Sequence, residues 1–166
     1  MKLIKIIILI ICFTSCKHYE DYKFNEKFNN NIKIIERLYN YEDSIHKLGL
    51  DTCIEYEYDL EYYKGVKEAI AYNEVVTKIS MNYNLEGGGY FYESPIITIN
   101  KWEKWYNENK YQITLKKGDS IYFEKIEAPL IALEIMITEG SFYSEERIGF
   151  LEDSIRNQFR DNYDTN

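Results

Sequence analysis

Few residues of this 166-residue chain have the type and spacing to do chemistry. The two histidines, His18 and His46, are far apart in the sequence, so neither has a second imidazole nearby with which to bind a metal or relay a proton. The glycines at 87–89 lack the strand and the following Gly-Lys-Ser of a phosphate-binding loop and are predicted to form a turn. Acidic residues are abundant, but only the distance between two carboxyl groups in the folded protein would decide whether they could hydrolyse a glycoside. The sequence therefore predicts no catalytic residue, no metal and no cofactor.

Among the three cysteines, Cys16 has the most informative surroundings. Lys2 and Lys5 precede an apolar run over residues 6–13, which the small residues Thr14 and Ser15 follow. This is the charged, apolar and small-residue order of a secretory signal. The apolar run is shorter than the ~20 residues that a membrane-spanning helix needs. Residues 1–15 are therefore predicted to be a signal peptide.

The stretch Phe13-Thr14-Ser15-Cys16 resembles the lipobox of bacterial lipoproteins. The resemblance implies that the chain is cut between Ser15 and Cys16 and that palmitate-type acyl chains are attached at Cys16. Two or three such chains, at ~0.8 kcal/mol per buried methylene, make a stable anchor, whereas one chain is marginal. The membrane, reached through the lipid on Cys16, would then be one partner of the protein.

The resemblance also implies a location. In some Gram-negative bacteria an aspartate after the cysteine keeps a lipoprotein in the inner membrane, and Lys17 occupies that position here. We therefore expect the cell outer membrane. The sequence leaves open whether the domain faces the periplasm or the cell surface.

The net charge of the mature chain limits its other partners. Removing residues 1–15 takes away two lysines and no acid, which leaves 18 basic and 28 acidic residues and a formal charge of −10. Such a domain repels nucleic-acid phosphates and anionic lipid headgroups. A basic protein is the expected partner, and nucleic acid is not. Cys53 would be the one cysteine left unmodified, so no intramolecular disulfide is expected.

The predicted organisation is a signal peptide at 1–15, a polar tether at 16–30 and a single globular domain at 31–166. Apolar residues at three- and four-residue steps predict a helix from Ile32 to Leu48, which Gly49 ends, and a second helix from Val66 to about Ser80. The segment 52–63 fits two structures. Its strict alternation of apolar and acidic residues is typical of a strand, but Thr52 and Glu55 also form the capping box of a helix.

The aromatic residues Trp102, Trp105 and Tyr106 are candidate binding residues. Within a helix expected over 102–109, capped by Asn100 and preceded by a short extended piece at 95–99, they share one face and could form a platform for stacking on a sugar. At helical spacing, such residues more often anchor a core. The segment 70–110, with its Trp-x-x-Trp pair, also resembles parts of helical-repeat and immunity-type lipoproteins, which implies a partner-binding scaffold without chemistry.

The fold class is predicted to be mainly α, or α+β: a helical domain with one or two short β-hairpins. Residues 82–92 form a loop or the first hairpin, and residues 111–126, with a turn at 117–119, form the second. The apolar run 129–137 is either a buried strand or a buried helix, and a closing amphipathic helix follows over 144–159.

Two functions from different classes follow. The first is a non-enzymatic interaction module on the membrane, of the immunity or assembly type, whose acidic surface meets a basic partner. The second is a small lipid-anchored hydrolase or glycan-handling accessory protein. Buried tryptophans would favour the first, and an exposed Trp102 or Trp105 beside two facing carboxylates would favour the second.

Overall fold

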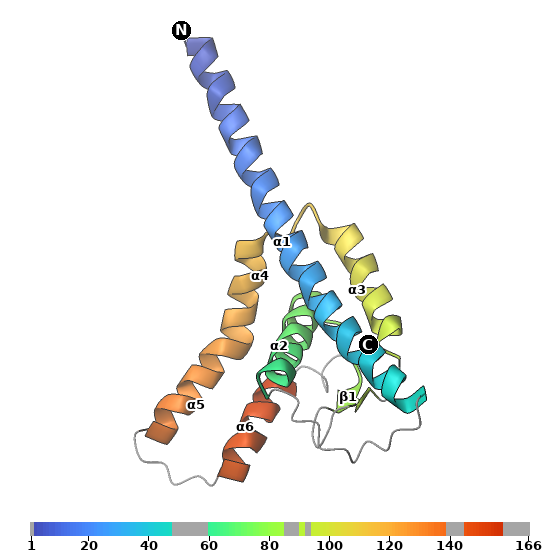
Figure 1. Cartoon of the computed structure of the whole chain (residues 1–166). Coiled ribbons are helices and arrows are strands. Elements are labelled where there is room, and N and C mark those ends of the chain that lie inside the picture. The colour runs from blue at the N-terminus through green and yellow to red at the C-terminus, as the bar shows by residue number, and fades with distance from the viewer. Residues whose placement is uncertain (1, 48–59, 85–89, 92–93, 139–144, 158–166) are drawn as a thin grey trace.

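The computed structural model describes residues 2–47, 60–84, 90–91, 94–138 and 145–157. These residues form the helices α1 (Lys2–Lys47), α2 (Leu60–Thr77), α3 (Pro95–Asn109), α4 (Leu115–Tyr122), α5 (Ala128–Thr138) and α6 (Glu145–Asn157), with a π-helical turn η1 (Phe123–Glu127) between α4 and α5 (Figure 1). The prediction of a mainly helical fold is confirmed. The segment 52–59, which could be strand or helix by its sequence, lies outside the described residues, and Leu60 begins α2.

Helix α1 runs without a break through the expected signal peptide, the cleavage site and the tether. Its N-terminal half extends away from the other helices, and its C-terminal half crosses them (Figure 1). Within the part of the chain that the structure describes, no helix combines the length and apolar character needed to cross a membrane.

The packed domain begins earlier than the residue 31 expected from the sequence. Phe24 and Phe28 are fully buried and belong to the core, although they lie in the predicted tether. The polar residues around them concealed this periodicity, since Phe24, Phe28, Ile32, Ile35 and Leu38 form one stripe at three- and four-residue steps. The core-forming part of α1 therefore starts at Phe24 or before it.

The core lies where α1, α2 and α3 meet, and we call these three helices the bundle. Stacked rings join α1 to α3: the Phe28 ring lies 5.5 Å from that of Tyr106 and 6.4 Å from that of Trp105, measured between centroids. From α2, Val66, Ile70 and Tyr72 fill the same core. Burial of this apolar surface is the main stabilising term of the fold.

Helix α2 ends where Lys78 takes a backbone φ of +61°, the left-handed conformation that commonly ends a helix. The chain then turns over the buried carboxylate of Glu74, whose Oε1 accepts a 2.6 Å hydrogen bond from the Met81 amide. Tyr83–Asn84 (β1) and Tyr90–Phe91 (β2) pair antiparallel, with Tyr83 opposite Phe91. Each paired stretch is two residues long, and Tyr83 adds one buried ring to the core.

The prediction of an extended piece at 95–99 is wrong, because α3 begins at Pro95. Proline is favoured in the first turn of a helix, where its missing N–H costs nothing. The β-branched residues at 96–99 have strand propensity, but the buried positions Pro95, Thr98, Ile99 and Trp102 have helical spacing. Burial of that stripe against the bundle outweighs the local propensity.

The second hairpin, expected over 111–126, is also wrong. The structure has α4 and η1 there, and Thr114 caps α4 by accepting a 3.2 Å hydrogen bond from the Lys117 amide. Gly118, expected in the turn, lies inside the helix and is buried. In η1 the Ala128 amide donates to the Phe123 carbonyl, a π-type bond that immediately precedes Pro129. Proline cannot donate to the carbonyl four residues back and crowds it, so the wider turn relieves the clash.

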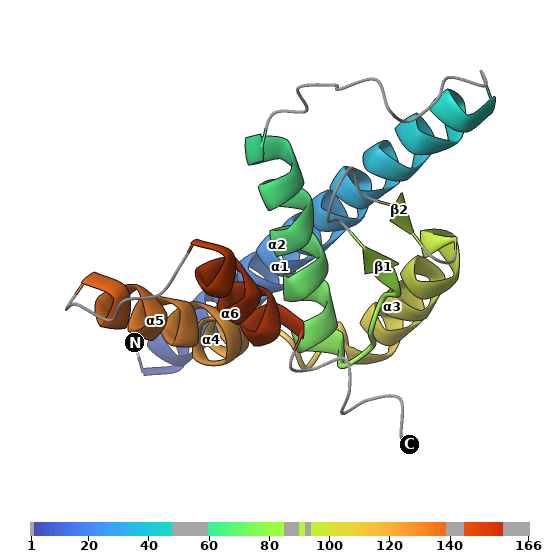
Figure 2. The same cartoon turned by 90° about the horizontal axis from the view of Figure 1, so that it is seen from below.

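Helix α5 and helix α6 pack on each other, and with η1 we call them the C-terminal arm. Figure 2 shows the arm on one side of α2 and α3 on the other. The apolar run 129–137 is a helix, as one of its two predictions had it, but Leu133 is the one residue of α5 that is buried. The closing helix predicted over 144–159 is confirmed as α6, and residues 144, 158 and 159 lie outside the described residues.

Candidate functional site

An open depression of about 610 Å³ lies where α4 and η1 meet α1. Its lining mixes two cations, two carboxylates and several apolar or hydroxyl side chains: Lys27, Leu115, Lys116, Asp119, Ser120, Tyr122, Phe123 and Glu127. Lys27 comes from α1, Glu127 ends η1, and the other six come from residues 111–126, which the sequence assigned to a hairpin. A side-chain surface of this mixed kind suits recognition of a polypeptide.

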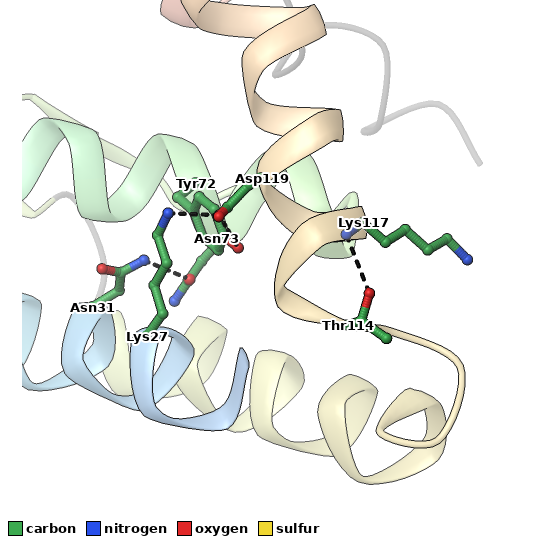
Figure 3. A network of polar contacts seen from close by, with 7 residues as sticks. All are labelled: Lys27, Asn31, Tyr72, Asn73, Thr114, Lys117 and Asp119. Carbon is green, nitrogen blue, oxygen red and sulfur yellow. Dashed lines mark hydrogen bonds and ion pairs between the residues drawn. The ribbon is translucent and has the colours of Figure 1, made fainter. Parts of the chain in front are cut away.

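Three side chains from three helices meet at the inner end of the depression (Figure 3). The Oδ1 atom of Asp119 accepts a 2.7 Å contact from Lys27 Nζ and a 3.1 Å hydrogen bond from the Tyr72 hydroxyl. The Lys27 ammonium also lies 4.1 Å from the centroid of the Tyr72 ring, within cation–π range. Lys27 and Asp119 are both about two-fifths exposed, so their ion pair contributes little to the free energy of unfolding. Its main effect is to hold α4 in position against α1.

Gly118 allows this meeting of helices. A Cβ atom at this position would lie 2.5 Å from the Tyr72 hydroxyl and 2.9 Å from Cε2 of Phe24. Any side chain would therefore push α4 away from α1 and α2. A glycine in mid-helix costs stability, and here the close approach requires it.

The two tyrosines beside the depression hold their protons tightly. Burial first, and then the Asp119 carboxylate, raise the pKa of Tyr72 above its ordinary value. Burial, together with Glu68 and Glu127, raises the pKa of Tyr122 to about 12, although Arg156 opposes this. Both phenols are therefore neutral hydrogen-bonding groups at physiological pH.

A second polar contact lies one helical turn further along α1. Asn31 Nδ2 donates to Asn73 Oδ1 at 3.2 Å, as Figure 3 shows beneath the Lys27 contact. Asn73 is fully buried, and its Nδ2 has no hydrogen-bond partner among the residues that the structure describes. This partly buried contact helps to fix the register of α1 against α2.

The candidate binding residues Trp102, Trp105 and Tyr106 divide between two situations. Trp102 is fully buried, and its Nε1 donates a 2.9 Å hydrogen bond to the Ile79 carbonyl, so it has no face on which a sugar could stack. Trp105 and Tyr106 are half-buried and stack on Phe28. The core alternative that the helical spacing offered is therefore the one that fits Trp102.

The other residues singled out by type are three residues of α1 and one cysteine. Cys16, His18 and His46 lie along α1, and Cys53 lies outside the described residues. Among the described residues, no group of three histidine, cysteine, aspartate or glutamate side chains could hold a metal ion.

The sequence analysis missed an exposed apolar surface on the C-terminal arm. Phe123, Ile131, Ile135 and Met136 are each about half exposed, and Phe150 of α6 is 71% exposed. A signal for it was present, because α5 carries one charged residue, Glu134, and has no polar face. A helix that is apolar all round needs a covering on every side, and the described residues bury α5 on one side, at Leu133.

No family model, no curated protein and no solved structure matches this chain.

Proposed function

We propose that the protein is an outer-membrane lipoprotein, anchored by lipid on Cys16, whose domain is a non-enzymatic interaction module of the immunity or assembly type for a basic protein partner. The lipid anchor is supported by the order of residues at the N-terminus. Lys2 and Lys5 come first, the apolar run follows, and the stretch Phe13-Thr14-Ser15-Cys16 ends it. A lipid anchor restricts the module to work at a membrane surface.

Charge and exposed apolar surface support a protein partner. The mature chain would carry a formal charge of −10, and residues 123–157 hold eight acidic and three basic residues, a formal charge of −5. The preceding stretch, 95–122, has five basic and three acidic residues, a formal charge of +2. Residues 123–157, where apolar side chains are exposed, therefore also carry a net negative charge, and this combination favours a basic protein over a nucleic acid or an anionic membrane.

The alternative, a hydrolase or glycan-handling accessory protein, has less support. Trp102 is enclosed in the core. The depression does contain two carboxylates, but that of Asp119 accepts hydrogen bonds from Lys27 and Tyr72, which connect three helices. The exposed apolar surface of the arm has no role in this alternative.

Acyl labelling of cysteine variants tests the anchor. The full chain, expressed in a bacterium fed a labelled fatty acid, should carry the label and partition with membranes, and Cys16→Ala should lose the label. Cys12→Ala and Cys53→Ala are matched controls and should keep it. Persistence of the label in Cys16→Ala would refute lipidation at this residue.

An affinity pull-down of the anchored protein tests the module. A basic protein recovered with the wild-type chain is the expected result, and its recovery should fall as salt is raised, because screening weakens charge pairing. Recovery of a glycan and no protein would favour the alternative.

A further inference from the structure

We infer that the exposed face of α5, with the adjoining depression, is the docking site for an amphipathic helix whose apolar stripe is bordered by lysine or arginine. The inference rests on the proposed function, because it gives the basic partner a place and a form. In this arrangement the partner helix contacts η1 and α5, and the bundle serves as a scaffold.

The apolar part of this surface has helical spacing. Leu130, Leu133 and Ile137 lie on the covered side of α5. Ile131 and Ile135, four residues apart, and the adjacent Met136 are 47–50% exposed on the other side. A row of this kind matches the anchors at three- and four-residue steps that a bound helix presents.

The depression extends the same surface towards the bundle. Phe123 and Glu127 line it and also begin the arm, so the depression and α5 form one continuous surface. Phe123 is half exposed, and Leu115 and Tyr122 also line the depression. A hydrophobic anchor of the partner therefore has a hollow to enter at this end.

Acidic side chains border the surface. Glu124, Glu127 and Glu134 are all exposed along η1 and α5, and Lys125, the one cation in this stretch, lies 3.2 Å from Glu124. Two copies of the surface would bring carboxylates face to face, which opposes self-association. A helix bordered by lysine or arginine would pair its charges with them instead.

The position of α5 also argues against the membrane as its covering. In Figure 1, α5 lies at the end of the molecule opposite the N-terminal half of α1, which includes Cys16, the proposed anchor residue. The acidic border would in addition be repelled by anionic lipid. The partner is therefore expected to approach from the side facing away from the anchoring membrane.

Two synthetic peptides of about 18 residues, roughly five helical turns, make a direct probe. Both carry the same leucine stripe, and one has lysines on its borders where the other has glutamates. Binding to the full chain in nanodiscs of neutral phosphatidylcholine is followed by fluorescence anisotropy, with empty nanodiscs subtracted. We expect the lysine-bordered peptide to bind on the order of tenfold more tightly, and to lose this advantage at high salt.

Matched variants locate the site. Ile131→Ser with Ile135→Ser should weaken binding of the lysine-bordered peptide by about tenfold, since two half-exposed isoleucines lose their apolar contact. Ile96→Ser with Ile97→Ser is the control on α3, where the two side chains are 50% and 52% exposed, and should change the affinity by less than about twofold. All four positions are exposed, so both variants are expected to fold, and circular dichroism checks this.

Several results would overturn the docking site. Equal affinity for both peptides would show that charge does not contribute to binding. An equal loss of affinity in the α3 control variant would show that α5 is not the binding site. Disulfide-linked dimers of Met136→Cys would show that a second copy covers the face, and protection of α5 in nanodiscs of anionic lipid would show that the membrane does. If a basic partner is recovered by pull-down and Ile131→Ser with Ile135→Ser leaves it bound, this docking site fails while the interaction module stands.

Discussion

The bundle and the C-terminal arm have similar proportions of apolar residues, but they bury them differently. In the bundle, apolar stripes on α1, α2 and α3 face one another, and rings such as Phe24, Phe28 and Trp102 are fully buried. In the described part of the arm, Ile126 and Leu133 are the buried hydrophobic residues, while larger side chains are half exposed. The bundle buries most of its apolar stripes, and the arm leaves more of its apolar side chains exposed.

The comparison is tested most strongly by removing one phenylalanine from each region. Phe28→Ala should destabilise the fold by about 3–5 kcal/mol, because it leaves a cavity among three stacked rings. Phe123→Ala, at a ring that is 50% exposed, should cost about 1 kcal/mol or less. Urea unfolding followed by circular dichroism measures both, and equal costs would break the distinction between bundle and arm.

Replacing two glycines by alanine is expected to change the stability of the protein in opposite directions. Gly118→Ala should destabilise by about 1–3 kcal/mol, since the new methyl group meets Tyr72 and Phe24 at under 3 Å. Gly149→Ala in α6, where a Cβ atom meets nothing within 4 Å, should stabilise by about 0.5–1 kcal/mol through helix propensity. Thermal unfolding reports both changes, and a neutral Gly118→Ala would mean that α4 does not pack as closely as described.

A smaller effect tests the junction of bundle and arm, where Tyr122 lies near Glu68 of α2, Glu127 of η1 and Arg156 of α6. Because folding raises the pKa of Tyr122 from about 10 to about 12, the folded state holds the phenolic proton more tightly, and its stabilising effect is lost as pH rises through this range. Tyr122→Phe should make the decline in stability between about pH 10 and 12 shallower. Tyr111→Phe, which removes a phenol at a side chain that is 73% exposed, is the control variant.

The sequence predicted the helices whose apolar stripes are simple and failed where local propensity and packing disagree. The helix at 32–48 and the closing helix were found because one face of each is clearly apolar. The β-branched run 96–99 and the turn-like Lys117-Gly118-Asp119 indicated strands and a hairpin, but burial of Ile99 and close packing at Gly118 make both segments helical. Such tertiary contacts are not visible in a window of sequence.

The candidate site was less predictable than the fold for the same reason. Lys27, Tyr72 and Asp119 are distant in sequence, and no spacing rule joins them. Trp102, the residue type most often linked to binding, is in the core, whereas the exposed face belongs to Ile131 and Ile135. An apolar helix is expected to be buried from its sequence, and only the structure shows which side is left uncovered.

Hydrogen exchange of the full chain in nanodiscs, with and without the lysine-bordered peptide, tests the location of the interaction surface most directly. Amide exchange reports local opening, so a bound helix should slow it in η1 and α5 over residues 123–138 and leave α3 over residues 95–109 unchanged. Protection confined to α3 or α1, or none at a peptide concentration that saturates binding, would contradict the assignment of partner binding to the C-terminal arm.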